Sequence, residues 1–168
     1  MRWFGKPRRY TADNVSWVLA NYDLCPKILT LIQDNFAYMN DRVDPPSSMH
    51  SLTVASVVKQ MENEILLAII ENKIPVACAF VTELDDAFYI GKLAATENKR
   101  GRGAGAALIE WVENLSRESG IAKPLRLETR IELTENHALF ARLGFVKTEE
   151  TAHPGYVHPT SITMEKQV

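Results

Sequence analysis

Residues Phe88–Ser119 read FYIGKLAATENKRGRGAGAALIEWVENLSRES, and this stretch decides the fold. Its first residues form an apolar run with the length of a strand, and its last fifteen or so follow a helical pattern. Between them, Gly101, Gly103 and Gly105 leave the backbone free of side chains where the helix begins. We therefore expect a strand, a basic glycine-rich turn and a long helix, with the remaining segments arranged around them.

The turn between this strand and this helix suits an anion. The first turn of a helix has about four N–H groups without an intrahelical partner, and the peptide dipoles add roughly half a positive charge. Hydrogen bonds to a charged group contribute about 1.5–3 kcal/mol each, whereas the dipole contributes about 0.3–1 kcal/mol. Close approach of the backbone therefore matters more than the field. A flexible basic turn is the alternative, but the order of strand, basic turn, glycines and helix favours a phosphate site.

Two common phosphate-binding loops are excluded by the residues of this turn. A P-loop needs Lys and then Ser or Thr after its last glycine, but Ala106 and Ala107 follow Gly105. A dinucleotide-binding loop needs a glycine at its sixth position, which counted from Gly101 is also Ala106. The pattern that remains, over residues 100–105, is R-x-x-G-x-G.

Composition and charge are those of an ordinary globular chain. Its 168 residues suit a single domain, which we place at residues 15–166 after an extension over residues 1–14. The net charge of -2 offers no general attraction for nucleic acid or an anionic membrane, and we find no segment that would span a bilayer. We expect a cytoplasmic protein. Cys25 and Cys78 are too few for a metal site or a disulfide framework, so we expect no metal.

Hydrophobic periodicity predicts an α/β (α+β) fold with one mixed, mostly antiparallel sheet, in the order β-α-α-β-β-β-α-β-α-β-β. Polar turns and glycines separate the elements. Strands are expected over residues 15–20, 64–70, 74–82, 87–95, 125–129, 145–149 and 161–165, and helices over residues 24–36, 53–62, 104–119 and 134–143. One parallel contact is expected, between the strands that flank the third helix, and that helix should expose Glu113.

Two motifs resemble those of the GCN5-related N-acetyltransferase (GNAT) family. The first is the R-x-x-G-x-G pattern within KLAATENKRGRGAGAALIEWV, Lys92–Val112, which resembles the family's acetyl-coenzyme A loop. The second is ENHALFARLGF, Glu135–Phe145, which is similar to the family segment N-x-x-x-[YF]-x-x-x-G-[FY]. With the element order, the resemblance covers Val15–Lys166. It implies a single-domain GNAT-like enzyme, an acyltransferase that uses acetyl-CoA as co-substrate.

The resemblance also implies which residues contact the cofactor. The pyrophosphate would be held by backbone amides of the glycine turn, and the pantetheine arm would lie along the preceding strand. The expected cofactor-binding residues are Leu93, Ala94, Ala95, Arg100, Gly101, Arg102, Gly103, Ala104, Gly105, Ala106, Asn136 and Phe140.

Phe140 is a departure from the family pattern. Many members have Tyr at this position, whose hydroxyl is thought to protonate the departing thiolate, and Phe140 has no proton to give. A thiol with a pKa of about 8.5 leaves tolerably well without an acid. Tyr156 or water are possible replacements. Phe140 also leaves open a second hypothesis, a non-catalytic acyl-CoA-binding or sensing module, which would bind CoA without releasing thiol from any acceptor.

A general base is also required, because a primary amine with a pKa of about 10.4 is mostly protonated at pH 7. Glu128 ranks first, since its strand should border the cofactor cleft; Glu83 and Tyr89 are further candidates. The alternative for Glu128 is an exposed carboxylate paired with Arg126 or Arg130.

The segment over residues 38–52, YMNDRVDPPSSMHSL, is either one wall of the acceptor cleft or a surface connector between two helices. Its DPPSS portion looks like that of a bacterial subgroup of the family. As a wall, it would supply Tyr38, Ser47 and Ser48 to the acceptor, with Tyr89 opposite. The acceptor itself, a small-molecule or peptide amine, is not readable from the sequence, and the resemblance is compatible with a homodimer.

Overall fold

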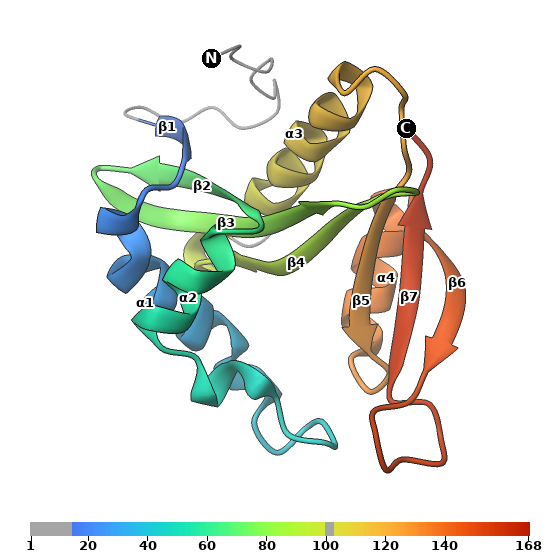
Figure 1. Ribbon diagram of the computed structural model, residues 1–168. Helices are drawn as coiled ribbons and strands as arrows, with labels where there is room; N and C mark the ends of the chain where they lie inside the picture. Colours follow the sequence, from blue (N-terminus) through green and yellow to red (C-terminus); the bar gives the residue numbers. More distant parts are fainter. Residues whose placement is uncertain (1–14, 100–102) are drawn as a thin grey trace.

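The computed structural model describes residues 15–99 and 103–168 (Figure 1). The predicted extension, residues 1–14, and residues 100–102 of the glycine turn lie outside the described residues. The helices are α1 (Cys25–Phe36), α2 (Val54–Met61), α3 (Ala104–Glu118) and α4 (Thr134–Arg142). The strands are β1 (Val15–Leu19), β2 (Ile65–Glu71), β3 (Ile74–Glu83), β4 (Phe88–Ala95), β5 (Leu125–Arg130), β6 (Val146–Thr151) and β7 (Ser161–Lys166). None of the helices described is both long and apolar enough to cross a membrane.

The strands form one sheet in the order β1-β2-β3-β4-β5-β7-β6 (Figure 1). Neighbouring strands are antiparallel except β4 and β5, which are parallel. A parallel pair needs a long crossover, and α3 supplies it. The predicted element order, the mostly antiparallel sheet and the single parallel contact are all confirmed, and the predicted ends of the elements agree within about two residues.

Helices cover both faces of the sheet and divide the core into two main layers. On one face, α1 and α2 pack on β2 and β3 around the fully buried Ile28, Ile32, Val57 and Phe80. On the other face, α3 packs on β2 to β5 and β7, with side chains of α4 at the margin. Burial of each large aliphatic or aromatic side chain contributes about 1.5–3 kcal/mol, so these layers hold the two faces of the sheet in place.

Local sequence signals explain several of the element ends. Thr53 and Ser56 form a capping box at the start of α2, in which each side chain accepts from the other residue's backbone N–H. Asn72 and Lys73 both take positive φ angles of 51° and 65°, as a two-residue hairpin turn between β2 and β3 requires. These turns are set by neighbouring residues, which is why the sequence predicted them.

Glu113 is the exception on α3. The helical pattern predicted it on the exposed side, but it is only 9% exposed. Its carboxylate forms ion pairs with Lys166 of β7 and with Arg117 one turn along the helix. The prediction was wrong because the periodicity of one helix does not show which charges the neighbouring strand brings.

Candidate active site

Strands β4 and β5 separate in the middle of the sheet, and the candidate site lies where they part. Their parallel pairing ends at Ile90 and Leu127. Just beyond, Lys92 takes a φ of 48° and the register between β3 and β4 shifts. Such a bulge bends a strand, which here carries β4 away from β5. From Gly91 and Glu128 onward, the two strands therefore continue without pairing to each other; we call this divergence the split.

The edge of β4 along the split offers backbone N–H groups. The N–H of Thr96 donates to the carbonyl oxygen of Val76 on β3 at 2.9 Å. Successive N–H groups of a strand point to opposite edges, so those of Leu93 and Ala95 point away from β3. In agreement, the N–H of Ala95 donates to Oδ1 of Asn35 at 3.4 Å. An extended ligand with amide groups can pair with this edge, as predicted for the pantetheine arm.

Helix α3 begins beside the split with amides suited to an anion. Its N-cap, Gly103, has a φ of 88°, a left-handed conformation that costs other residues about 1–2 kcal/mol. The first intrahelical bond runs from the N–H of Ala107 to the carbonyl oxygen of Gly103 at 2.8 Å. The N–H groups of Ala104, Gly105 and Ala106 come before that bond and are not used within the helix. A Cβ built at Gly103 or Gly105 would meet no described atom within 4 Å, so the backbone is open to a ligand.

Asn136 and Phe140, the two cofactor residues predicted on α4, have different surroundings. Nδ2 of Asn136 donates to the hydroxyl of Tyr38 at 3.1 Å and to Oγ1 of Thr129 at 3.5 Å. The structure thus brings a predicted cofactor residue and a predicted acceptor residue together. Phe140 packs edge-on against Phe145, with ring centroids 5.9 Å apart, at the margin of the core.

Glu128 is the first residue of β5 beyond the paired section. Because side chains alternate along a strand, Leu127 points into the α3 layer and Glu128 points to the opposite face. Its side chain is exposed and forms no ion pair or hydrogen bond with the other described residues. The alternative in which Glu128 pairs with Arg126 or Arg130 is not observed, since those side chains bind other carboxylates.

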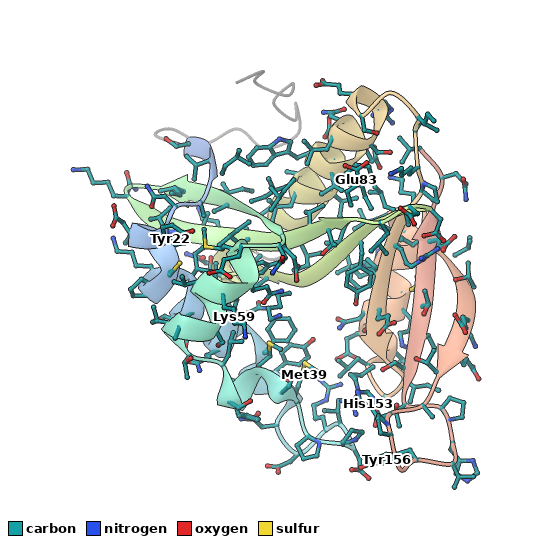
Figure 2. All side chains as sticks on the ribbon, in the orientation of Figure 1. Tyr22, Met39, Lys59, Glu83, His153 and Tyr156 are labelled. Carbon is teal, nitrogen blue, oxygen red and sulfur yellow. The ribbon has the colours of Figure 1, made fainter. Side chains whose placement is uncertain are left out.

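The other two base candidates are less well placed. The Glu83 carboxylate lies 2.8 Å from Nζ of Lys123, at the paired end of β4 and away from the split (Figure 2). Burial raises the pKa of Tyr89 to about 12, with smaller contributions from the negative charges of Glu128 and Glu64. At neutral pH the Tyr89 phenol is therefore protonated, and it can donate a hydrogen bond in the site but is a poor base.

Three polar residues on the face of the sheet that α1 and α2 cover were not predicted from the sequence. Nζ of Lys92 donates to Oε1 of Gln60 at 2.7 Å, and Nε2 of Gln60 donates to Oε1 of Glu64 at 2.9 Å. Burial lowers the pKa of Lys92, whose Nζ lies 5.4 Å from the centre of the Phe80 ring. The sequence signal for Lys92 was a lysine within an otherwise apolar strand. Alternation of side chains along the strand would have predicted the face on which it lies, but the bulge at Lys92 interrupts that alternation.

The segment after α1, which we call the cleft loop (residues 37–52), reaches across to the opposite half of the molecule. The hydroxyl of Tyr156 donates to Oδ1 of Asp44 at 2.5 Å, and the N–H of Asp44 donates to Oε1 of Glu132 at 3.1 Å. Arg42 forms an ion pair with Glu135 at 2.7 Å. Figure 2 shows Tyr156 in the β6–β7 loop, beside the cleft loop. These contacts favour the cleft-wall interpretation of the segment over the surface connector.

Ser47 and Ser48, both predicted to contact the acceptor, serve the local structure of the cleft loop. Oγ of Ser47 accepts from the N–H of Met49 at 3.3 Å, and the carbonyl oxygen of Ser48 accepts from Oγ of Ser51 at 2.9 Å. These bonds stabilise the single turn of 3-10 helix over Ser48–Ser51. An acceptor contact by either serine stays a prediction.

Tyr156, the predicted replacement acid, is held at the rim. Its hydrogen bond to Asp44 raises the pKa of the phenol. A proton held by a carboxylate in this way is less available to a thiolate, and the residue belongs to the loop between β6 and β7 and not to the split. The structure therefore gives Tyr156 a contact that joins two loops, and its role as an acid stays a prediction.

A cavity of about 680 Å³ lies between α1 and the end of β4. Among its lining residues are Lys27 and Asn35 of α1 and Ala95, Thr96 and Glu97, which lead into the glycine turn. Its volume is within the usual range of about 300–1,000 Å³ for small-molecule sites. The end of β4 thus has room beside it for a ligand.

A family model described as the acetyltransferase (GNAT) family matches residues 29–145. No curated protein sequence matches the chain.

Solved structures are similar over most of the chain. PaiA N-acetyltransferase from Thermoplasma acidophilum, in complex with coenzyme A, has a TM-score of 0.77 and 10% identity, over 92% of this chain and 99% of that one. Ribosomal-protein-S18-alanine N-acetyltransferase from Escherichia coli has a TM-score of 0.66 and 18% identity, over 91% of this chain and 93% of that one. A GNAT family acetyltransferase from Elizabethkingia anophelis, with acetyl-CoA bound, has a TM-score of 0.62 and 18% identity, over 94% and 100%. At these identities the likeness is one of fold.

Proposed function

Because the chain belongs to the acetyltransferase (GNAT) family and is an acyltransferase, we propose that it moves an acetyl group from acetyl-CoA directly to a primary amine of a small molecule or a peptide. The observation that carries this proposal is the position of Glu128. Its carboxylate, which has no ion pair among the described residues, belongs to the first residue of β5 beyond the section paired with β4, across the split from Leu93.

The donor is assigned to the β4 side of the split. Its pantetheine arm would pair with the backbone of Leu93–Ala95, and its pyrophosphate would accept hydrogen bonds from the amides of residues 101–106. The left-handed Gly103 and the free first turn of α3 support this assignment, because they leave several N–H groups open to one anion. Arg100 and Arg102 would add positive charge, and Asn136 would contact the arm.

The reaction needs no covalent intermediate on the protein. The amine nitrogen attacks the thioester carbonyl carbon, a C–N bond forms, and the C–S bond breaks to release the thiolate of CoA. Glu128, directly or through a water, accepts the proton that the amine must lose. The N–H of Leu93 would donate to the oxyanion of the tetrahedral intermediate, and its direction away from β3 supports this role.

Phe140 affects the last step, in which the released thiolate is protonated. With no hydroxyl at that position, the thiolate takes its proton from water, which a thiol with a pKa of about 8.5 permits near neutral pH. We expect a slower release of thiol than a positioned acid would give, because such acids typically contribute about 10²–10⁴-fold.

The test is a thiol-release assay with acetyl-CoA and a panel of primary amines, together with the shift in thermal unfolding caused by CoA. We expect CoA to raise the melting temperature and at least one amine to release thiol above the rate of hydrolysis. Protection by CoA with no thiol release for any amine would overturn the proposal in favour of a binding module.

A further inference from the structure

The outward face of β5 carries three polar side chains that differ in how well their hydrogen bonds are satisfied. Arg126, in the paired section, is fully engaged: its Nη2 lies 2.7 Å from Asp86 and its Nε lies 2.7 Å from Glu165. Glu128, two residues further on, has no partner among the described residues. Arg130, two residues beyond Glu128 on the same face, is only partly satisfied.

Arg130 is buried yet has an unused donor. The residue is 9% exposed, its Nε donates to the carbonyl oxygen of Thr160 at 3.3 Å, and the carboxylate of Glu132 lies 3.9 Å from the same nitrogen. Its Nη2 is buried and donates to no acceptor among the described residues. Leaving a buried charged donor without an acceptor is unfavourable, so an acceptor from a ligand would satisfy this nitrogen. Because the nitrogen has almost no accessible surface, the ligand reaches it only when the side chains over it move apart.

Glu128 and Arg130 therefore need complementary groups from a ligand. The carboxylate of Glu128 requires a hydrogen-bond donor, and Nη2 of Arg130 requires an acceptor. Their Cα atoms are roughly 6.6 Å apart along the strand, two residues at about 3.3 Å each. A ligand that carries an amine and a nearby carbonyl group would complement this pair.

We propose that the acceptor is the amino-terminal segment of a peptide, with its α-amine at Glu128 and a main-chain carbonyl oxygen accepting from Nη2 of Arg130. This inference rests on the proposed function, since it assumes that the amine reacts at Glu128. It assigns Arg130 as the residue that distinguishes a peptide from a simple alkylamine.

The charges around Arg130 favour a neutral carbonyl over a carboxylate. Glu132 lies next to the guanidinium, the backbone of Asp44 is bound to Glu132, and Glu128 stands two residues away. A further anion here would be repelled by the Glu132 carboxylate, which already lies beside this cation. A carbonyl oxygen supplies the missing acceptor without that repulsion, and the same carboxylates attract the ammonium form of the incoming amine.

The position of Arg130 also gives the peptide a way out of the cleft. The guanidinium of Arg130 lies beside Glu132, whose carboxylate accepts from the N–H of Asp44, and Asp44 in turn accepts from Tyr156 at the rim. A chain that starts at Glu128 and passes Arg130 therefore runs toward the gap between the cleft loop and the β6–β7 loop. The hydrogen bond between the exposed side chains of Tyr156 and Asp44 joins these loops there, and such a contact is weak enough to open.

The experiment compares two acceptors, triglycine amide and pentylamine, with the wild-type protein and with Arg130→Met. For each protein, the ratio of kcat/KM for the peptide amide to that for the alkylamine is measured. The different basicity of the two amines affects both proteins equally, so it cancels when the ratios are compared. We expect the ratio to fall about 10- to 100-fold in Arg130→Met, as for loss of one hydrogen bond to a charged group.

Arg126→Gln is the matched control, because it removes a guanidinium from the same face of the same strand whose donors already have partners. It should leave the ratio within about twofold of wild type. If Arg130→Met does not fold, Arg130→Lys, which keeps a charge but not the fork of donors, should still lower the ratio.

An unchanged ratio in a folded Arg130 variant overturns the inference, as does a preference for triglycine with a free carboxylate over triglycine amide that disappears with Arg130. Thiol release from pentylamine in those cases leaves the proposed function standing. No thiol release with any amine, in the presence of CoA binding, would instead remove the proposed function itself.

Discussion

The two strands that border the split present different chemistry. On β4, Leu93–Ala95 have small or apolar side chains, and what the strand offers to a ligand is its backbone. On β5, Glu128 and Arg130 offer side chains. Binding through the backbone requires open space, and it leaves a pattern of glycine and alanine in the sequence. Binding through a side chain requires one residue in the right place and leaves no pattern, so the donor side of such a site is easier to read than the acceptor side.

Of the variants that distinguish β5 from β4, Glu128→Gln should have the largest effect on activity. It should lower kcat/KM for thiol release about 10²–10⁴-fold, the usual contribution of a general base, and leave the affinity for acetyl-CoA within about twofold. Glu149→Gln is the matched control: Glu149 and Glu128 both pair with Thr163, from either side of β7, but Glu149 is two strands further from the split. Equal activity of the two variants would remove Glu128 as the base.

Gly103→Val, in contrast, should change the affinity for the donor: we expect acetyl-CoA binding to weaken about 10-fold or more. A β-branched residue strains the left-handed φ of 88° and covers the amides of the first turn. Arg102→Ala should cost less affinity, because it removes charge but not access. Isothermal titration with CoA measures both.

Gly120→Val controls for strain in this comparison. Gly120 has a φ of 102° at the other end of α3, away from the glycine turn. It should lower stability in a similar way and retain CoA affinity. Affinities that are the same in wild type, Gly103→Val and Arg102→Ala would contradict the phosphate site.

A smaller effect is expected from the bulge that parts the strands. Lys92→Val places a β-branched residue at a φ of 48° and should lower the free energy of unfolding by about 1–3 kcal/mol relative to Lys92→Gly. Both variants lose the hydrogen bond to Gln60, so that bond does not contribute to their difference. Urea unfolding measures it, and equal stabilities would mean that the positive φ does not hold β4 in place.

The smallest effect is expected on the titration of Tyr89, a β4 residue that pairs with Arg126 of β5. Its pKa, raised from 10.0 to about 12, means that the folded protein holds this proton more tightly than the unfolded chain. The resulting stabilisation is present below about pH 10 and is lost as the pH rises through about 12. Ultraviolet titration of the tyrosines should show a component near pH 12 that is absent in Tyr89→Phe. Ionisation of all tyrosines near pH 10 would contradict the burial of this phenol.

The fold could be predicted from the sequence because its determinants are local. Thr53, the Asn72–Lys73 turn and Gly103 act on their immediate neighbours, and the apolar periods are long enough to separate strands from helices. Glu113 shows the limit of this reasoning, since its partner Lys166 lies on a distant strand.

The same limit applies to the site. The glycine turn and Asn136 were assigned by motif, and Glu128 by its place near the end of a strand. Lys92, Gln60 and Arg130 escaped because their roles depend on a bulge and on which donors other strands leave unpaired. Tyr38 was predicted on the cleft wall, but its contact with Asn136 joins segments 98 positions apart, a separation that no local pattern encodes.

The split has a consequence for the protein without its ligand. Beyond Ile90 and Leu127, the facing edges of β4 and β5 lie inside the sheet without pairing to each other. Exposed edges are where other chains add as extra strands, so the feature suited to an extended donor is also an opening for self-association. A ligand that pairs with the edge of β4 would therefore also close that opening to other chains.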